Sequence, residues 1–393
     1  MNFPVQYDLQ YGAGSVCGPE EEAAVLEVLR AGAPGYGPAS RAFEKAFSEF
    51  IGVDHALAVS SGSAALHLAM MALGLAPGDE VITTPLSWMS TANGAALAGA
   101  KVVFADIDPR TFTLDPAAVE AKITDRTKAI VPVHLYGQPA AIDEITTIAR
   151  RHGCALIEDC AHAPGALYKG RKVGSFGDLA IFSFGTQKNM TTLGEGGMVV
   201  TNRADLAERV RSYRWICAHG PETDGRFCHW EAPNYWNLEF PDVGFNYRMT
   251  DVQAAVGLVQ LRKIDGLNHR RRQIAAGYTH GLAGMAGLTL PFVAVDCYHV
   301  FHVYCVLVET ELGVSKEEFM MRLWRDKGVK PWSHYHLIHL TEAYRRRGHR
   351  AGECPVAESL QSKYVSLPIH PRLTDEAVEY LIQSVRAMVP VAA

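Results

Sequence analysis

The sequence lacks several features that would assign it to other classes of protein. Its eight cysteines form no C-x-x-C pair and are scattered at positions 17, 154, 160, 217, 228, 297, 305 and 354. Scattered cysteines suit a reducing compartment rather than a disulfide framework. No apolar run is long enough to span a bilayer. The start, MNFPVQYDLQYG, has neither the basic nor the apolar region of a signal peptide. We therefore expect a soluble, cytoplasmic protein with no membrane association.

Concentrated positive charge is also missing. The formal net charge is −5, and the arginine triplets at 270–272 and 345–347 are isolated in mixed surroundings. Without a basic block, nucleic acid is not an expected partner. No G-x-G-x-x-G follows the first strand-like run, which argues against a nicotinamide dehydrogenase.

Short apolar runs alternate with helical patterns in the first half of the chain. The strand-like runs are 55–60, 80–84, 101–106, 128–135, 154–159, 179–184 and 198–201. Helical patterns occupy 63–73, 87–98, 116–123 and 140–152, after two N-terminal helices at 19–31 and 40–51. This alternation predicts an α/β fold whose mostly parallel, seven-stranded sheet is flanked by helices.

The second half of the chain is organised differently. A helix at 203–213 is followed by an irregular segment at 215–247 that contains Trp215, Trp230, Tyr235 and Trp236, and such segments are usually functional or at an interface. A long helix at 250–280 leads to a smaller α+β part. There we expect a strand at 298–309, a helix at 315–327 capped by Ser315, and a closing helix at 374–389. The length of 393 residues allows two domains, which we place at 1–250 and 251–393.

Lys188 lies between the last two strand-like runs, in a segment too short and Gly-rich for a full helix. An amine at the mouth of a buried sheet is poorly solvated, so its pKa should fall and its nucleophilicity rise. Such a lysine can form a Schiff base with pyridoxal phosphate. The alternative is an ordinary solvated loop lysine, and this segment alone does not decide between them.

The neighbouring strands decide the question. Ligands of parallel sheets bind beyond the carboxyl ends of the strands, which places Ser61, Pro85, Asp106, Asp159 and Ser183 near one rim. The turn at Gly62 and Ser63 opens a helix and suits a phosphate, to which Ser183 could add a hydroxyl, although such turns are common.

Three further side chains could face the ring of the cofactor. Trp88 could stack on a flat ring or belong to the core. Asp159 could pair with a protonated pyridine nitrogen or cap a turn. His162 could lie beside the ring's phenolic oxygen or be an ordinary hydrogen-bonded histidine. The order of these features, with Lys188 last, favours a pyridoxal-phosphate site.

Residues 18–385 closely resemble the DegT/DnrJ/StrS-type sugar aminotransferases. The resemblance rests on SSGSAALHLA, GDEVITTPLSW, EDCAHAPGA, FSFGTQKN, LGEGG, GFNYRMTDVQAA and SLPIHPRLTDE, which occur in the family's order and spacing. It implies the aspartate aminotransferase fold (fold type I). It also implies that Lys188 is the internal aldimine lysine, that Asp159 binds the pyridine nitrogen, and that Trp88 and His162 contact the ring. Gly62, Ser63 and Ser183 would hold the phosphate, with Asn246 reaching it from the partner subunit of a homodimer that shares its active sites.

The same resemblance implies the reaction. An amino group would pass from an amino acid, L-glutamate, to a nucleotide-linked keto-deoxy sugar. The alternative within the class is a keto-cyclitol aminotransferase of aminoglycoside-type pathways. Related sugar dehydratases replace the lysine by histidine, so Lys188 argues against them. A non-enzymatic regulator with the same fold would be expected to lose Lys188 or Asp159, and both are present.

Two departures from the family and one competing site remain. Gly185 stands where many members carry histidine or another polar residue, and the loop at 221–241 is longer and more aromatic than usual. Both affect the expected sugar subsite rather than the cofactor. His334, His336 and His339 resemble a metal site, but no carboxylate or cysteine completes it nearby and the spacing is unsuitable. We expect no metal, and the resemblance places a substrate-facing loop there.

Overall fold

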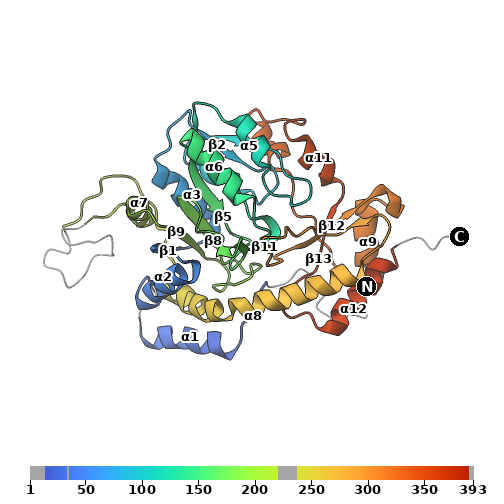
Figure 1. Ribbon diagram of the computed structural model, residues 1–393. Coiled ribbons are helices and arrows are strands. Elements are labelled where there is room, and N and C mark those ends of the chain that lie inside the picture. Colours follow the sequence, from blue (N-terminus) through green and yellow to red (C-terminus); the bar gives the residue numbers. More distant parts are fainter. Residues whose placement is uncertain (1–13, 33–34, 220–236, 389–393) are drawn as a thin grey trace.

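A seven-stranded, mostly parallel sheet forms the centre of the molecule (Figure 1). The computed structural model describes residues 14–32, 35–219 and 237–388. The strands of the main sheet are β1 (His55–Val59), β2 (Glu80–Thr83), β3 (Lys101–Phe104), β4 (Thr127–Val131), β5 (Ala155–Asp159), β8 (Leu179–Ser183) and β9 (Gly197–Thr201). Their order is β1-β9-β8-β5-β4-β2-β3, and β9 runs antiparallel to both of its neighbours. The α/β expectation and the strand-like runs are confirmed.

Helices cover both faces of this sheet. They are α2 (Pro38–Ile51), α3 (Gly62–Leu73), α4 (Ser90–Leu97), α5 (Pro116–Lys122), α6 (Ile142–His152) and α7 (Ala204–Arg214), whereas α1 (Pro19–Arg30) packs against the long helix at Asp251–Gly281. Alternate residues of β8 point to opposite faces of the sheet. Leu179 and Ile181 pack with α3, α4 and α7, whereas Ala180 and Phe182 pack on the α2 side. Helices α5 and α6 pack against Ile82, Ile130 and Leu156. Both faces of the sheet are therefore buried, as parallel sheets require.

The long helix α8 (Asp251–Gly281) runs from the α2 side of the molecule to α12 (Asp375–Arg386) (Figure 1). Its first half packs in the larger body through Ala254, Leu261 and Ile264. Its second half joins a separate, smaller core through Ile274 and Tyr278. Because α8 is shared in this way, the division at residue 250 stays a prediction.

The smaller core covers a three-stranded antiparallel sheet. Its strands are β10 (Leu288–Thr289), β12 (Tyr304–Val308) and β13 (Tyr364–Leu367). Helix α9 (Lys316–Lys327) packs on it and is capped by Ser315, whose Oγ accepts from the Glu318 N–H at 3.1 Å. The remaining elements are β6 (Leu167–Tyr168), β7 (Arg171–Lys172), β11 (Cys297–Tyr298), α10 (Glu342–Arg345), α11 (Pro355–Gln361) and three short 3₁₀ turns, Leu135–Gly137, Thr310–Leu312 and Ile338–Leu340.

Three expectations need correction. The segment 298–309 is not one strand, because β11 pairs with β6 and only β12 belongs to the smaller sheet. Helix α4 begins at Ser90, so Trp88 precedes it. Asp106 follows the edge strand β3, far along the sheet from β5, and its carboxylate instead caps α11 by accepting from the Val356 and Ala357 N–H groups.

Part of the expected aromatic segment lies outside the described residues. This applies to Trp230, Tyr235, Trp236 and most of the loop at 221–241. The described remainder is irregular, with isolated bridges that pair Trp215 with Asn246 and His219 with Glu239. None of the described helices is both long and apolar enough to cross a membrane.

Candidate active site

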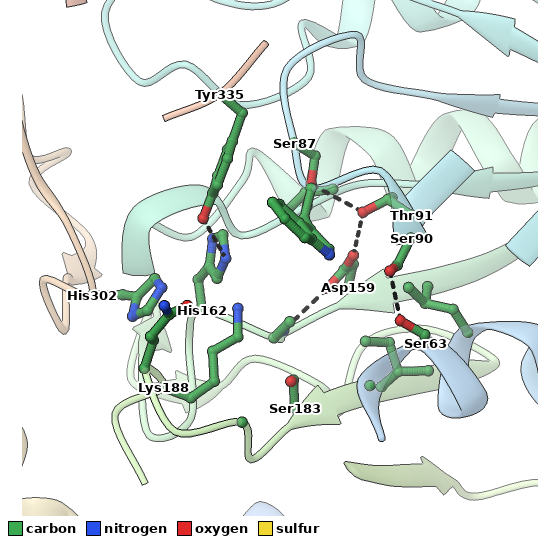
Figure 2. Close-up of a pocket in the computed structure, with 18 of the residues that line it drawn as sticks. Ser63, Ser87, Ser90, Thr91, Asp159, His162, Ser183, Lys188, His302 and Tyr335 are labelled. Atoms are coloured by element: carbon green, nitrogen blue, oxygen red, sulfur yellow. Dashed lines mark hydrogen bonds between the residues drawn. The ribbon is translucent and has the colours of Figure 1, made fainter. Parts of the chain in front are cut away.

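A cavity of about 440 Å³ opens at the carboxyl ends of β5 and β8. Figure 2 shows side chains from several elements pointing into it, with Lys188, Asp159 and His162 facing the same space. The expected residues that line it are Gly62, Ser63, Trp88, Asp159, His162, Ser183, Gly185 and Lys188. Their arrangement follows from the sheet, because the turns after neighbouring parallel strands meet at one edge.

The turn that carries Lys188 is anchored by the residues on either side of it. Phe184 and Met190 are fully buried in the core on the α2 side, and the Lys188 N–H donates to the Gly185 carbonyl at 2.9 Å. Next to the lysine, the Asn189 amide donates to Asn268 Oδ1 of α8 at 2.9 Å and to the Val300 carbonyl at 3.1 Å. These anchors leave the Lys188 side chain directed into the cavity.

Burial lowers the pKa of Lys188 to about 8, and the nearby carboxylates of Asp159 and Glu195 offset part of that effect. Among the described residues, no hydrogen bond or ion pair holds its ammonium group. The neutral, nucleophilic amine is therefore far more populated near neutral pH than in a lysine whose pKa is 10.5. The alternative of an ordinary solvated lysine does not fit this environment.

Asp159 ends β5 with its carboxylate almost completely buried, at 2% exposure. Burial raises the pKa of Asp159 above its usual value, while the Thr91 hydroxyl, the Ala161 N–H and Lys188 act in the opposite direction. The Thr91 hydroxyl donates to Oδ2 at 2.8 Å and the Ala161 N–H to Oδ1 at 3.1 Å. A buried carboxylate that faces a cavity is best stabilised by a cationic or protonated partner in that cavity.

The first turn of α3 forms the other end of the cavity. Ser61 caps the helix, since its Oγ accepts from the Ala64 N–H at 3.1 Å. The leading N–H groups of a helix have no acceptor within it, so they suit an anion. A Cβ on Gly62 would lie 2.7 Å from the Ser183 Cβ, which means that only glycine allows this approach. Ser63 exchanges a 2.6 Å hydrogen bond with Ser90.

His162 is a neutral imidazole on the cavity wall. Burial, with Lys188 and His334, lowers the pKa of His162 well below its usual value. Its Nδ1 accepts from the Tyr136 N–H at 3.4 Å, so Nε2 carries the proton that faces the Tyr335 hydroxyl at 3.2 Å. The ring stacks on His302 with centroids 4.3 Å apart.

Two expected residues are exposed in the single chain. Trp88 lines the cavity but is 58% exposed, with its ring edge-on to Tyr335. Asn246 is exposed and is not among the described residues that line the cavity of its own chain. Its Oδ1 accepts from the Arg248 Nε at 3.3 Å. Trp88 thus offers an exposed ring to the cavity, whereas Asn246 lies outside the described lining of the cavity in its own chain.

The structure adds residues that sequence reasoning missed. Ser87, Ser90 and Thr91 follow β2 and could have been found from their place after a strand. Glu195, His302, Trp332 and Tyr335 also line the cavity, and no periodic pattern marks them. Ser61 and Pro85, expected at the rim, do not line the cavity within the described part of the chain; Ser61 caps α3, and the Pro85 carbonyl accepts from the Ile338 N–H.

The three histidines of the competing metal site do not converge. His334 is buried with Nδ1 2.8 Å from Ser366 Oγ, His336 is exposed, and His339 bonds Glu358 at 2.9 Å. Within the described ranges, the close group of potential metal ligands is His134, Glu158 and Cys160. The carboxylate there already accepts from several chain donors, which leaves little room for an ion.

The cavity as a whole fits pyridoxal phosphate. It offers a helix N-terminus for the phosphate, with a glycine where a Cβ would block Ser183. It also offers a buried carboxylate for a protonated ring nitrogen, and an amine of lowered pKa for the aldehyde. These three features line one cavity.

Comparisons with known proteins identify the family of this chain. The model of the DegT/DnrJ/EryC1/StrS aminotransferase family matches residues 16–386. GDP-perosamine synthase of Caulobacter vibrioides is 42% identical over 342 residues, which are 86% of this chain and 87% of that protein. DesV of S. venezuelae, solved in complex with a ketimine intermediate, is 36% identical with a TM-score of 0.86 and 95% of each chain covered. Spr1654 of Streptococcus pneumoniae in its PLP form is 26% identical with a TM-score of 0.87, covering 96% of this chain and 98% of that one. The chain therefore belongs to the DegT/DnrJ/EryC1/StrS aminotransferase family and is a pyridoxal-phosphate-dependent aminotransferase.

Proposed function

We propose that the protein transfers the amino group of L-glutamate to the keto group of a nucleotide-linked keto-deoxy sugar. The observation that carries the proposal is the Lys188 amine, whose pKa burial lowers to about 8, in one cavity with the buried Asp159 carboxylate. The sugar is supported by the relative named GDP-perosamine synthase, whose name specifies a GDP-linked product.

The residues that would hold the cofactor surround the cavity. Gly62, Ser63 and Ser183 would bind the phosphate, Trp88 would cover one face of the ring, and His162 would lie beside it. When bound, pyridoxal phosphate would supply an aldehyde that reacts with amines and a ring that accepts electron density.

Asp159 and Lys188 would do the proton chemistry. Asp159 would keep a proton on the ring nitrogen, because a buried carboxylate is stabilised by a positive partner. Lys188 would bind the aldehyde at rest and, once released, remove the proton from the α-carbon of the amino donor. A pKa of about 8 suits this work, since a general base is most effective when its pKa lies near the working pH.

Asn246 would act across a homodimer. It is exposed and outside the described lining of its own cavity, and it lies on a segment anchored to Trp215 by a bridge. A two-fold interface would make the exchange reciprocal and give two composite sites. Mixing Lys188→Ala subunits with subunits carrying a disabling Asn246 substitution should restore one intact site. Mixed dimers that form but stay inactive would assign Asn246 to its own subunit.

The substrate proposal is tested by a panel of acceptors. Purified protein with glutamate and pyridoxal phosphate would be incubated separately with UDP-, GDP- and dTDP-linked keto sugars and with a keto-cyclitol. Product mass should show that an amino group replaces the keto oxygen on one nucleotide-linked sugar. Amination of the cyclitol alone would favour the alternative acceptor, and replacement of glutamate by another effective donor would overturn the donor assignment.

A further inference from the structure

The short segment from Ser87 to Thr91 reaches three parts of the cavity at once (Figure 2). The Thr91 hydroxyl contacts Asp159, and Trp88 lines the cavity wall. Ser90 meets Ser63 on the first turn of α3 at 2.6 Å. Because α4 begins at Ser90, Ser90 and Thr91 are held in the first turn of a helix rather than in a loop.

The hydrogen bonds to Asp159 have a defined direction. An ionised carboxylate can only accept, so the Thr91 hydroxyl must donate its single hydrogen to Oδ2, at 2.8 Å. Thr91 then has no hydrogen left for Ser87, whose Oγ lies 2.9 Å away, so Ser87 donates to Thr91. The chain of bonds therefore runs from Ser87 through Thr91 to Asp159 (Figure 2).

All three side chains of this chain are buried, at 3% exposure for Ser87 and 2% for both Thr91 and Asp159. Water therefore cannot replace a missing donor easily, and a hydrogen bond to a charged group is worth more in such a place. The Ala161 N–H occupies one lone pair of Oδ1, and the second lone pair of that oxygen is left to accept a hydrogen from the cavity.

We propose that Thr91 is a positioning residue for the reaction: its hydroxyl, oriented by Ser87, keeps the Asp159 carboxylate ionised and aimed at the ring nitrogen of the cofactor. Without this donor the carboxylate becomes more basic and takes the proton from the nitrogen. The ring then accepts electron density less well, although Thr91 itself touches no reacting atom. The inference rests on the proposed role of Asp159.

The test uses holoenzyme loaded with pyridoxal phosphate labelled with ¹⁵N in the ring. The ¹⁵N resonance distinguishes a protonated from an unprotonated ring nitrogen, so it reports the proton directly rather than activity. Thr91→Val keeps the shape and removes the donor, and Thr91→Ser restores the donor. The matched control is Thr83→Val, because Thr83 is equally buried and its hydroxyl donates to the Val131 carbonyl at 2.9 Å, away from the cavity lining.

We expect Thr91→Val to move the resonance toward unprotonated pyridine and to lower kcat about tenfold to a hundredfold, the size expected for one bond to a charged group. Thr91→Ser should return both quantities to within a few-fold of wild type, and Thr83→Val should leave the resonance in place. A resonance that stays protonated in Thr91→Val, or that moves equally in Thr83→Val, would overturn the inference.

Two further variants test the proposal if Thr91→Val does not fold, and distinguish the role of Thr91 from that of Asp159. If Thr91→Val does not fold, Ser87→Ala removes the outer bond and should move the resonance in the same direction by a smaller amount; no movement contradicts the proposal. Asp159→Asn separates the two claims. If it leaves the resonance unmoved, the role proposed for Asp159 fails; if it moves the resonance while Thr91→Val does not, only the inference about Thr91 fails.

Discussion

Glu158 and Asp159 are adjacent, buried carboxylates at the end of β5, yet their surroundings differ completely. Glu158 accepts from the N–H groups of Gly174, Phe176 and Gly177 at 2.7–2.8 Å, and His134 Nε2 lies 3.0 Å from it. Asp159 accepts from one N–H group and one hydroxyl and faces the cavity.

The difference arises because successive residues of a strand point to opposite faces of the sheet. His134 Nδ1 accepts from the Ala140 N–H at 3.0 Å, so its Nε2 carries a hydrogen for Glu158 and the group is complete. On the Asp159 side, the Lys188 amine has no bonded partner among the described residues. A buried carboxylate whose hydrogen bonds are all made within the chain, such as Glu158, is expected to stabilise the fold. A buried carboxylate that still faces a cavity, such as Asp159, is expected to bind a ligand or take part in the reaction.

The largest expected effect is a loss of activity when Lys188 is replaced, which replacement of His134 should not cause. Lys188→Ala should lower transamination more than about 10⁴-fold, since it removes both the attachment point and a proton transfer that alone contributes about 10²–10⁴-fold. His134→Ala should instead lower the melting temperature, because it opens a cavity and removes one of the four donors that surround the Glu158 carboxylate. Steady-state kinetics and thermal melts of both variants measure this. A folded His134→Ala variant that is as inactive as Lys188→Ala would contradict the purely structural role given to His134.

Asp159→Asn should lower kcat by about 10²–10⁴-fold with the fold intact. Breaking a buried charge pair costs about 3–5 kcal/mol, which corresponds to that range of rates. Kinetics of the holoenzyme, with circular dichroism as the folding control, would show the loss. Wild-type activity in this variant would reduce Asp159 to a turn cap.

Glu158→Gln should lower the stability of the fold and leave the activity largely unchanged, the opposite of Asp159→Asn. The amide cannot accept from all of the N–H groups that the carboxylate satisfies, and each buried donor left without an acceptor costs about 1–3 kcal/mol. Denaturant unfolding of the apoprotein should reveal this loss, whereas kcat of the folded enzyme should stay within a few-fold of wild type. A stable but inactive Glu158→Gln enzyme would contradict the assignment of the two carboxylates.

The smallest effect concerns stability and pH. Burial lowers the pKa of Lys188 from 10.5 to about 8, so between these values the unfolded chain binds more protons than the folded one. Wild-type apoprotein should therefore gain stability as pH rises from about 8 to 10.5. Lys188→Met should lack this gain and should be more stable than wild type at pH 7. Apoprotein melts across this pH range test the sign, and parallel curves for the two proteins would contradict it.

Much of the fold and part of the site could be predicted from the sequence, for physical reasons. The strands are short and apolar, and their carboxyl ends and the segments that follow them bring Gly62, Asp159, Ser183 and Lys188 to one cavity. Asp106 was placed wrongly at the same rim because strand order is not visible in a single sequence, and β3 is an edge strand.

The remaining wall of the cavity could not be predicted. His302, Trp332 and Tyr335 come from the last hundred residues and meet β5 only through tertiary packing, without a repeating pattern. Thr91 could have been found from its place after β2, but its contact with Asp159 could not be predicted, for a different reason. The helix was expected from residue 87 but begins at Ser90, and the contact of Thr91 with Asp159 depends on that start.

The most direct measurement is borohydride reduction of the holoenzyme followed by peptide mass spectrometry. Reduction should fix the cofactor covalently to one lysine, with loss of the visible absorbance. The account predicts that the added mass is found on Lys188 and is absent from Lys188→Ala protein treated in the same way. Added mass on another lysine, or none in a protein saturated with pyridoxal phosphate, would contradict it.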